Sequence, residues 1–258
     1  MPDRTKDAPD GEREDPARET PISTDTTAVS DSGELPAVAP APPPPPDPAH
    51  AQAQEVAALY ATAREQSDRG DAAAAITSYK QLLLKESSHV RARNNLALLL
   101  EARGDAAGAL VELDRALSTE PDNVSVLCNR AAIHIAQNKL DPAETDLRKA
   151  ARLEPDNPEA LTSLGILLSK RARWREAIEP LERATRLEPG RAAAFYYLGD
   201  AYNQTDQLPL ALAAYEQAAA LNPANWRAHK GAGMVLDRMG RPQEATLAHQ
   251  RAREAQRK

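Results

Sequence analysis

The sequence predicts an all-α protein made of six consecutive helix-turn-helix repeats behind a disordered N-terminal arm. A proline recurs every 34 residues, at Pro121, Pro155, Pro189 and Pro223. Ala or Gly recurs at three fixed positions of the same period, and large apolar residues lie between them at helical spacing. A fixed period of this length is typical of proteins in which each repeat packs only on its neighbours. We therefore expect stacked helix pairs rather than one globular core.

Residues 1–46 are expected to form the disordered arm, which is acidic and rich in proline. They contain no aromatic residue and include the proline run 42–46. Residues 1–54 hold 11 acidic and 4 basic residues, so the formal charge of −6 comes from this end and the remainder is nearly neutral. The arm is a solvated spacer or, alternatively, a ligand for a proline-binding domain, although no aromatic or basic anchor flanks the run.

The repeat boundaries follow when the recurring proline is given the same position in every unit. Ser87 takes the place of this proline in the first unit. The six expected units, within a helical region of residues 47–258, are 56–89, 90–123, 124–157, 158–191, 192–225 and 226–258. The first helix is expected to begin near Pro48, because Asp47 and Pro48 match a helix N-cap and a first-turn proline.

Small residues mark the places where the helices are expected to cross at close range. Positions 8, 20 and 27 of the six units hold Ala or Gly in seventeen of eighteen cases, and Leu82 is the exception. Gly70, Gly104 and Asn138 fall between the two helices of a unit, where the left-handed conformation that ends a helix is expected. Pro180 falls inside an expected helix, which it should bend or deprive of one backbone hydrogen bond.

The pattern resembles that of the tetratricopeptide repeat family over about 203 residues. The fifth unit carries the resemblance in Phe195, Leu198, Gly199, Tyr202, Ala211, Tyr215, Ala218 and Pro223. The resemblance implies a right-handed superhelical solenoid whose first helices, called A helices here, line a concave groove. It also implies a scaffold or adaptor, not an enzyme, that binds a peptide or helix of a partner protein in this groove.

Groove residues of the family usually fall at positions 2, 5, 9 and 12 of each A helix. In this sequence the resemblance implies a binding groove formed by Arg91, Asn94, Leu98, Glu101, Ser125, Cys128, Ile135, Glu159, Thr162, Ile166, Ser169, Tyr196, Asp200, Asn203, Arg227 and Lys230. Leu98, Ile135 and Ile166 make its middle apolar, and its ends are polar and charged. We expect a partner to insert apolar side chains in the middle while polar side chains fix its register.

Three alternatives to a simple scaffold remain open at this stage. The chain could be a regulatory or targeting subunit of a separately encoded enzyme, or it could associate with itself. Weak binding of nucleic acid is a further alternative, because Lys170, Arg171, Arg173 and Arg175 surround Trp174. The overall charge argues against nucleic acid, since the helical part has no excess of basic residues.

No motif predicts catalysis, a cofactor or a metal. The sequence has neither the HExxH pattern of a zinc protease nor the glycine-rich loop of a nucleotide site, and no small-molecule substrate is indicated. Cys128 is the single cysteine, which excludes an internal disulfide. No apolar run reaches the length of a membrane span, and no secretory signal is visible, so we expect a cytoplasmic protein.

Overall fold

The computed structural model describes residues 48–257, and within this range it contains twelve α-helices and no strand. The expected arm of residues 1–46 lies outside the described residues. The helices are α1 (Pro48–Asp68), α2 (Ala72–Lys85), α3 (Val90–Ala102), α4 (Ala106–Thr119), α5 (Val124–Ala136), α6 (Leu140–Leu153), α7 (Pro158–Lys170), α8 (Trp174–Leu187), α9 (Ala192–Gln204), α10 (Leu208–Leu221), α11 (Trp226–Arg238) and α12 (Pro242–Arg257). The predicted all-α class is confirmed for this part of the chain.

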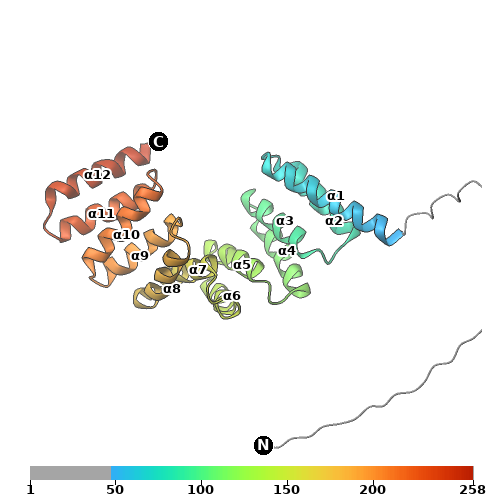
Figure 1. The fold of residues 1–258 in the computed structure, drawn as a ribbon, viewed down its shortest axis with the longest axis horizontal. Coiled ribbons are helices and arrows are strands. Elements are labelled where there is room, and N and C mark those ends of the chain that lie inside the picture. The colour runs from blue at the N-terminus through green and yellow to red at the C-terminus, as the bar shows by residue number, and fades with distance from the viewer. Residues whose placement is uncertain (1–47, 258) are drawn as a thin grey trace, which may run out of the picture. The chain divides into compact units, whose positions relative to one another are not determined.

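Each odd-numbered helix pairs with the helix that follows it, and the pairs stack in chain order (Figure 1). Successive A helices also contact each other from α3 to α11, whereas no comparable contact joins the even-numbered helices of the described region. The row of pairs therefore curves with its A helices on the inner side, as the ribbon shows for α5 and α7 against α6 and α8. This arrangement is the predicted solenoid.

The small residues lie where the helices touch. A β-carbon added to Gly165 would lie 2.3 Å from the Leu181 side chain, because α7 and α8 cross at this point. The alanines at equivalent positions, such as Ala116 and Ala184, are fully buried. Leu82, the one large residue in this set, is also fully buried and belongs to the apolar cluster of the first helix pair. Close helix contact thus explains the Ala and Gly pattern.

The turns between the two helices of a pair use left-handed backbone conformations, as predicted for Gly70, Gly104 and Asn138. Ala172 and Asp206 adopt the same conformation, with φ values of 56° and 65°. Alanine rarely adopts a positive φ, and aspartate adopts it only occasionally, so neither turn was predicted. The repeated geometry of the helix pair therefore imposes the turn even where the residue is unfavourable.

Helix ends and the internal proline agree with local chemistry. Asp71 Oδ1 accepts a hydrogen bond from Ala74 N at 3.1 Å, and Asp105 Oδ1 accepts one from Gly108 N at 2.8 Å, so both residues cap a helix. Helix α8 continues through Pro180, which is buried and has no N–H to donate to the preceding turn. None of the helices in residues 48–257 combines the length and apolar character needed to cross a membrane.

Candidate functional site

The expected groove residues lie on five successive A helices, α3, α5, α7, α9 and α11. In the apolar middle, the Leu98 residue is 44% exposed on α3, while Ile135 on α5 and Ile166 on α7 are half-buried. Asn129 Nδ2 donates a hydrogen bond to Asn94 Oδ1 at 2.8 Å and so connects α5 to α3. Apolar atoms are therefore accessible on three neighbouring helices of the inner side.

Four of the expected groove residues are buried instead of facing an open groove. The hydroxyl groups of Thr162 and Ser169 donate to carbonyls of their own helix, Pro158 O at 2.7 Å and Gly165 O at 2.9 Å. Asn203 is buried and accepts hydrogen bonds from the guanidinium of Arg238. Thr162 and Ser169 are therefore left out of the contact surface, whereas Asn203 also lines the pocket described below.

Cys128 is the fourth of these residues, and it is 2% exposed. Burial, together with the smaller effect of nearby carboxylates, first among them Glu159, raises the pKa of its thiol to about 12. The thiol is therefore neutral at physiological pH and packs as a small apolar side chain.

The other end of the row contains a pocket between α9 and α11, with a volume of about 260 Å³. Five expected groove residues line it, namely Tyr196, Asp200, Asn203, Arg227 and Lys230. The structure thus brings together side chains that the sequence places about 30 residues apart. The pocket is smaller than the roughly 300–1,000 Å³ of typical small-molecule sites, and its size suits one side chain of a peptide.

The floor of this pocket is a hydrogen-bonded group of two tyrosines and one carboxylate. Tyr215 Oη donates to Asp200 Oδ1 at 2.5 Å, and Tyr196 also donates to Asp200. Burial raises the pKa of Asp200 above its ordinary value, although the hydrogen bonds from both tyrosines oppose this effect. The carboxylate is therefore held internally by two donors and is poorly placed to bind a ligand cation.

Tyr215 reaches the pocket from α10, the outer helix of its pair, because two glycines make room for its ring. A β-carbon on Gly199 would lie 2.7 Å from the ring, and one on Gly231 would lie 2.6 Å from it. Sequence reasoning missed Tyr215 as a site residue because it considered only A helices. The glycines at 199 and 231 are the signal that could have revealed it.

Basic and apolar side chains form the walls of the pocket. The Arg227 guanidinium carbon lies 5.1 Å from the centre of the Trp226 ring, a cation–π arrangement. Lys230 and Met234 follow on the same helix, and Met234 is well exposed. The sequence analysis did not include Trp226, which lies at the first position of its unit.

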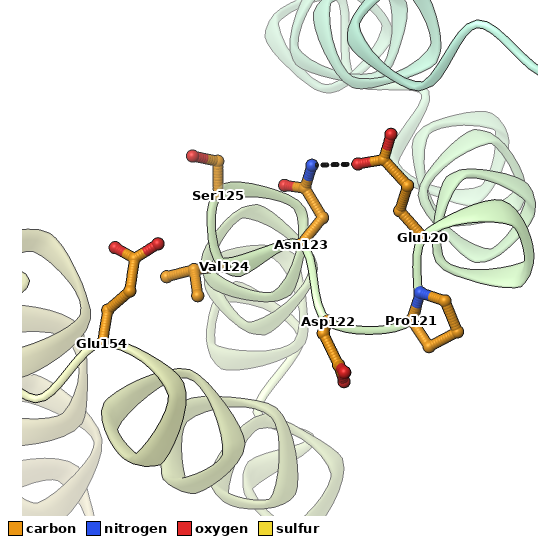
Figure 2. A pocket seen from close by; sticks show the side chains of 7 residues that line it. All are labelled: Glu120, Pro121, Asp122, Asn123, Val124, Ser125 and Glu154. Carbon is orange, nitrogen blue, oxygen red and sulfur yellow. Dashed lines mark hydrogen bonds between the residues drawn. The ribbon is translucent and has the colours of Figure 1, made fainter. Parts of the chain in front are cut away.

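Ser125 and Glu159 lie at the N-terminal ends of two A helices, α5 and α7. Ser125 lines a cavity of about 550 Å³ at the turn between α4 and α5, together with Glu120, Asp122 and Glu154 (Figure 2). Asn123 Nδ2 donates to Glu120 Oε2 at 2.7 Å, and Lys149 pairs with Asp122 at 2.9 Å. The cavity lies at an acidic turn, and two of its acidic side chains, Glu120 and Asp122, already have partners within the protein.

Arg91 and Glu101 lie at the two ends of α3, and both are exposed. Glu159 is likewise exposed at the start of α7. No ion pair involves these three residues within 48–257, so they remain available for a partner. They are separated along the row of helices and do not form one cluster with the pocket between α9 and α11.

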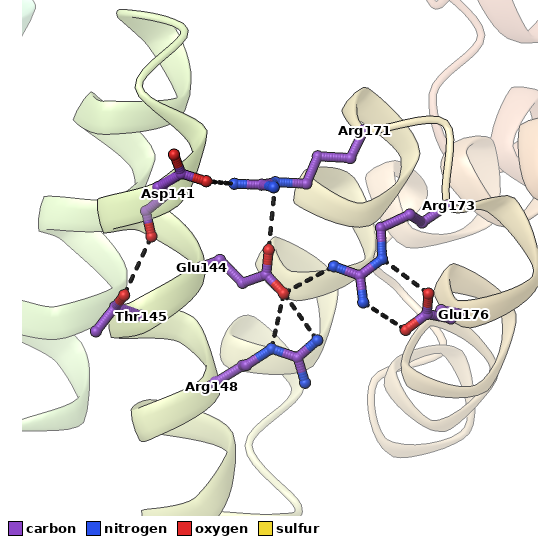
Figure 3. Close-up of polar contacts among 7 residues, drawn as sticks. All are labelled: Asp141, Glu144, Thr145, Arg148, Arg171, Arg173 and Glu176. Atoms are coloured by element: carbon purple, nitrogen blue, oxygen red, sulfur yellow. Dashed lines mark hydrogen bonds and ion pairs between the residues drawn. The ribbon is translucent and has the colours of Figure 1, made fainter.

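Two of the four basic residues around Trp174, Arg171 and Arg173, are engaged within the protein, while Lys170 and Arg175 are exposed. Figure 3 shows Glu144 on α6 between Arg171 and Arg173, with an oxygen–nitrogen distance of 2.8 Å to Arg173. Arg173 also pairs with Glu176 at 2.6 Å. Because the guanidinium groups of Arg171 and Arg173 already contact carboxylates, they offer little free positive charge to a nucleic acid.

The same network affects the ionisation of Glu144. Burial by itself would raise the pKa of Glu144, but hydrogen bonds from Arg148 and Arg173 lower the pKa below its ordinary value. Glu144 is thus ionised at neutral pH and joins α6 to the turn before α8. We assign this network a structural role between two repeats.

Comparison with known proteins agrees with the fold of stacked helix pairs. One profile described as tetratricopeptide repeat matches residues 60–125, 162–215 and 205–257, and a second matches residues 100–165. The chain belongs to the tetratricopeptide repeat family. Proteins of this family are generally scaffolds for protein–protein interaction and are typically not catalytic. No curated protein sequence matches this tetratricopeptide repeat chain.

Solved structures of tetratricopeptide repeat proteins share the fold. MamA is 26% identical, with a TM-score of 0.56 over 63% of this chain and 95% of its own. PilF of Pseudomonas aeruginosa is 18% identical, with a TM-score of 0.69 over 77% and 90%. YrrB, a TPR protein with an unusual peptide-binding site, is 20% identical, with a TM-score of 0.56 over 69% and 92%.

Proposed function

We propose that this tetratricopeptide repeat protein is a scaffold or adaptor that binds a peptide or helical segment of a partner protein along its A helices. The observation that carries the proposal is the pocket between α9 and α11, where five expected groove residues meet. Accessible apolar side chains on α3, α5 and α7 extend the same inner side. Family members generally bind proteins, and YrrB has a peptide-binding site, which supports this assignment.

The contact surface we propose has two parts. Leu98, Ile135 and Ile166 provide an apolar strip, which releases water when a partner's apolar side chains cover it. The pocket between α9 and α11 provides polar groups that fix the register of the bound segment. A partner that fills both parts must extend over several repeats, which an extended peptide or a helix can do.

The test begins with affinity capture from the native cell and continues with the purified partner. Leu98→Asp changes a residue that is 44% exposed, and Ile166→Ser is a milder change at a half-buried position. Each variant should weaken partner binding, whereas Val111→Asp on α4, whose side chain is exposed on an outer helix, should not. Circular dichroism checks that each variant remains helical.

Titration of the captured partner by calorimetry decides the outcome. We expect a loss of about tenfold in affinity per groove variant, because each change removes roughly 1–3 kcal/mol of apolar contact or adds an unpaired charge. Equal affinity for wild type and the two groove variants would contradict the proposal. Loss of binding in Val111→Asp alone would move the contact surface to the outer helices.

A further inference from the structure

We propose that the pocket between α9 and α11 binds the carboxylate of an acidic side chain in the partner segment, an inference that rests on the proposed function. Arg227 and Lys230 line the pocket, and neither charged group has an ion-pair or hydrogen-bond partner among residues 48–257. Many other arginines of this region are paired with carboxylates, as Arg130 and Arg173 are. The pocket therefore offers positive charge that the protein itself does not neutralise.

The two cations lie three residues apart on α11, which places them on one face of the helix. Like charges at this spacing repel each other, and an anion between them relieves the repulsion. The Arg227 guanidinium lies over the Trp226 ring, and the N–H donors of a guanidinium lie in its own plane. A planar carboxylate is the ligand that matches such donors, because it can accept two parallel hydrogen bonds.

Among the residues that the structure describes, Asp200 is the only acidic side chain that lines the pocket, and it does not compete for these cations. Its Oδ1 accepts the Tyr215 hydroxyl at 2.5 Å, and Tyr196 donates a second hydrogen bond. The unneutralised charge of the pocket is therefore positive.

A cationic ligand is the alternative that the aromatic residues raise, since tyrosine and tryptophan faces together with a carboxylate can bind ammonium groups. Here the Trp226 face is already covered by Arg227. The Tyr215 ring is held between Gly199 and Gly231, which leaves its faces against helix backbone. A second cation would also meet the repulsion of Lys230, so the pocket favours an anion.

The rim indicates what should stand next to the acidic residue. Met234 is well exposed beside the pocket, and the half-buried Tyr196 ring also lines it. An apolar neighbour of the bound acidic side chain can pack on both residues. The occupant is therefore an acidic segment with interspersed apolar residues, supplied by a protein partner.

The experiment uses the full chain and three short fluorescein-labelled peptides, which alternate Glu and Leu, Gln and Leu, or Lys and Leu. We expect the Glu–Leu peptide to bind about tenfold more tightly than the Gln–Leu peptide, because each charged hydrogen bond lost costs about that factor. Arg227→Gln and Lys230→Gln should each weaken its binding about tenfold. Lys80→Gln, which removes an exposed cation on α2, is the matched control and should leave binding unchanged.

Fluorescence of the two tryptophans localises the binding event. In a Trp174→Phe background, only Trp226 remains, and the Glu–Leu peptide should change its emission with the same midpoint as the anisotropy titration. Asp200→Asn should retain or increase the affinity for this peptide, because it removes the acidic side chain at the floor. Circular dichroism of every variant excludes unfolding as the cause of a loss.

Three results would overturn the inference: equal binding of the Glu–Leu and Gln–Leu peptides, tighter binding of the Lys–Leu peptide, or no binding of the Glu–Leu peptide at about 1 mM. The proposed function has a separate readout in the captured partner and Leu98→Asp. A partner that needs Leu98 but ignores Arg227→Gln and Lys230→Gln would leave the scaffold function standing and refute the acidic pocket.

Discussion

Replacing Asp146 with Ala should destabilise the helical unit strongly, because it leaves a charged guanidinium without its main partner. Arg130 on α5 donates through Nε and Nη2 to both carboxylate oxygens of Asp146 on α6, at 2.8 and 2.7 Å. The Asp146 side chain is 5% exposed. These hydrogen bonds raise the pKa of Arg130, which is ionised at every accessible pH and cannot avoid the loss by deprotonation.

The size of the effect follows from how much of the pair remains. Removing one partner of a buried ion pair costs about 3–5 kcal/mol. The Arg130 side chain is 24% exposed and keeps Asp114 at 2.8 Å, so water and this second carboxylate reduce the expected cost to about 2–4 kcal/mol. Asp114→Ala is the matched control, because the Asp114 side chain is 62% exposed and its loss should cost less than about 1 kcal/mol.

Urea unfolding followed by circular dichroism measures both changes. The double variant Arg130→Met with Asp146→Leu should regain most of the lost stability, because an apolar pair of similar volume can replace a buried ion pair. Equal midpoints for Asp146→Ala and Asp114→Ala would refute the reasoning. So would a double variant that is no more stable than Asp146→Ala.

Three further predictions concern packing and ionisation. Gly199→Ala should lower the free energy of unfolding by about 1–2 kcal/mol in thermal or urea unfolding, because overpacking against the Tyr215 ring exceeds the gain in helix propensity. The control is Gly190→Ala, whose added β-carbon meets nothing within 4 Å. It should change the free energy of unfolding by less than about 0.5 kcal/mol. Because the pKa of Glu144 is lowered in the folded state, its carboxylate stabilises the fold above its ordinary pKa of 4.5, and this stabilisation is lost as pH falls. The difference in free energy of unfolding between wild type and Glu144→Gln should therefore shrink between about pH 5 and pH 3. Cys128 should react with a thiol reagent at pH 8 only when urea unfolds the chain, since burial raises its pKa to about 12; rapid reaction of the native protein would contradict its buried position.

The period of the sequence predicts the helix pairs because close contact between helices demands a small residue at defined positions. Gly165 beside Leu181 shows the requirement directly. The resemblance to the family implies that the A helices lie on the inner side, but it gives only the approximate direction of each side chain. It could not foresee that Thr162 and Ser169 would turn their hydroxyls to their own backbone and lie buried.

The sequence pattern also could not predict which side chains pair between neighbouring repeats. Glu144 precedes Arg171 and Arg173 by nearly one repeat, and many other acidic residues lie at similar distances, so the pairing depends on the actual stacking. Tyr215 belongs to an outer helix, yet it forms part of the pocket floor because of Gly199 and Gly231. The family resemblance therefore indicated five of the residues that line the pocket, whereas Tyr215 and Trp226 required the three-dimensional arrangement.

The restriction of contacts to adjacent helix pairs has a mechanical consequence. When force or a protease acts at the C-terminal end, α11 and α12 can detach while the pairs before them keep their own neighbours. Arg227 and Lys230 would leave with them, so a single local opening removes the charged wall and releases whatever it holds. Tension on this end of the chain would thus release the proposed partner segment while the preceding helix pairs stay folded.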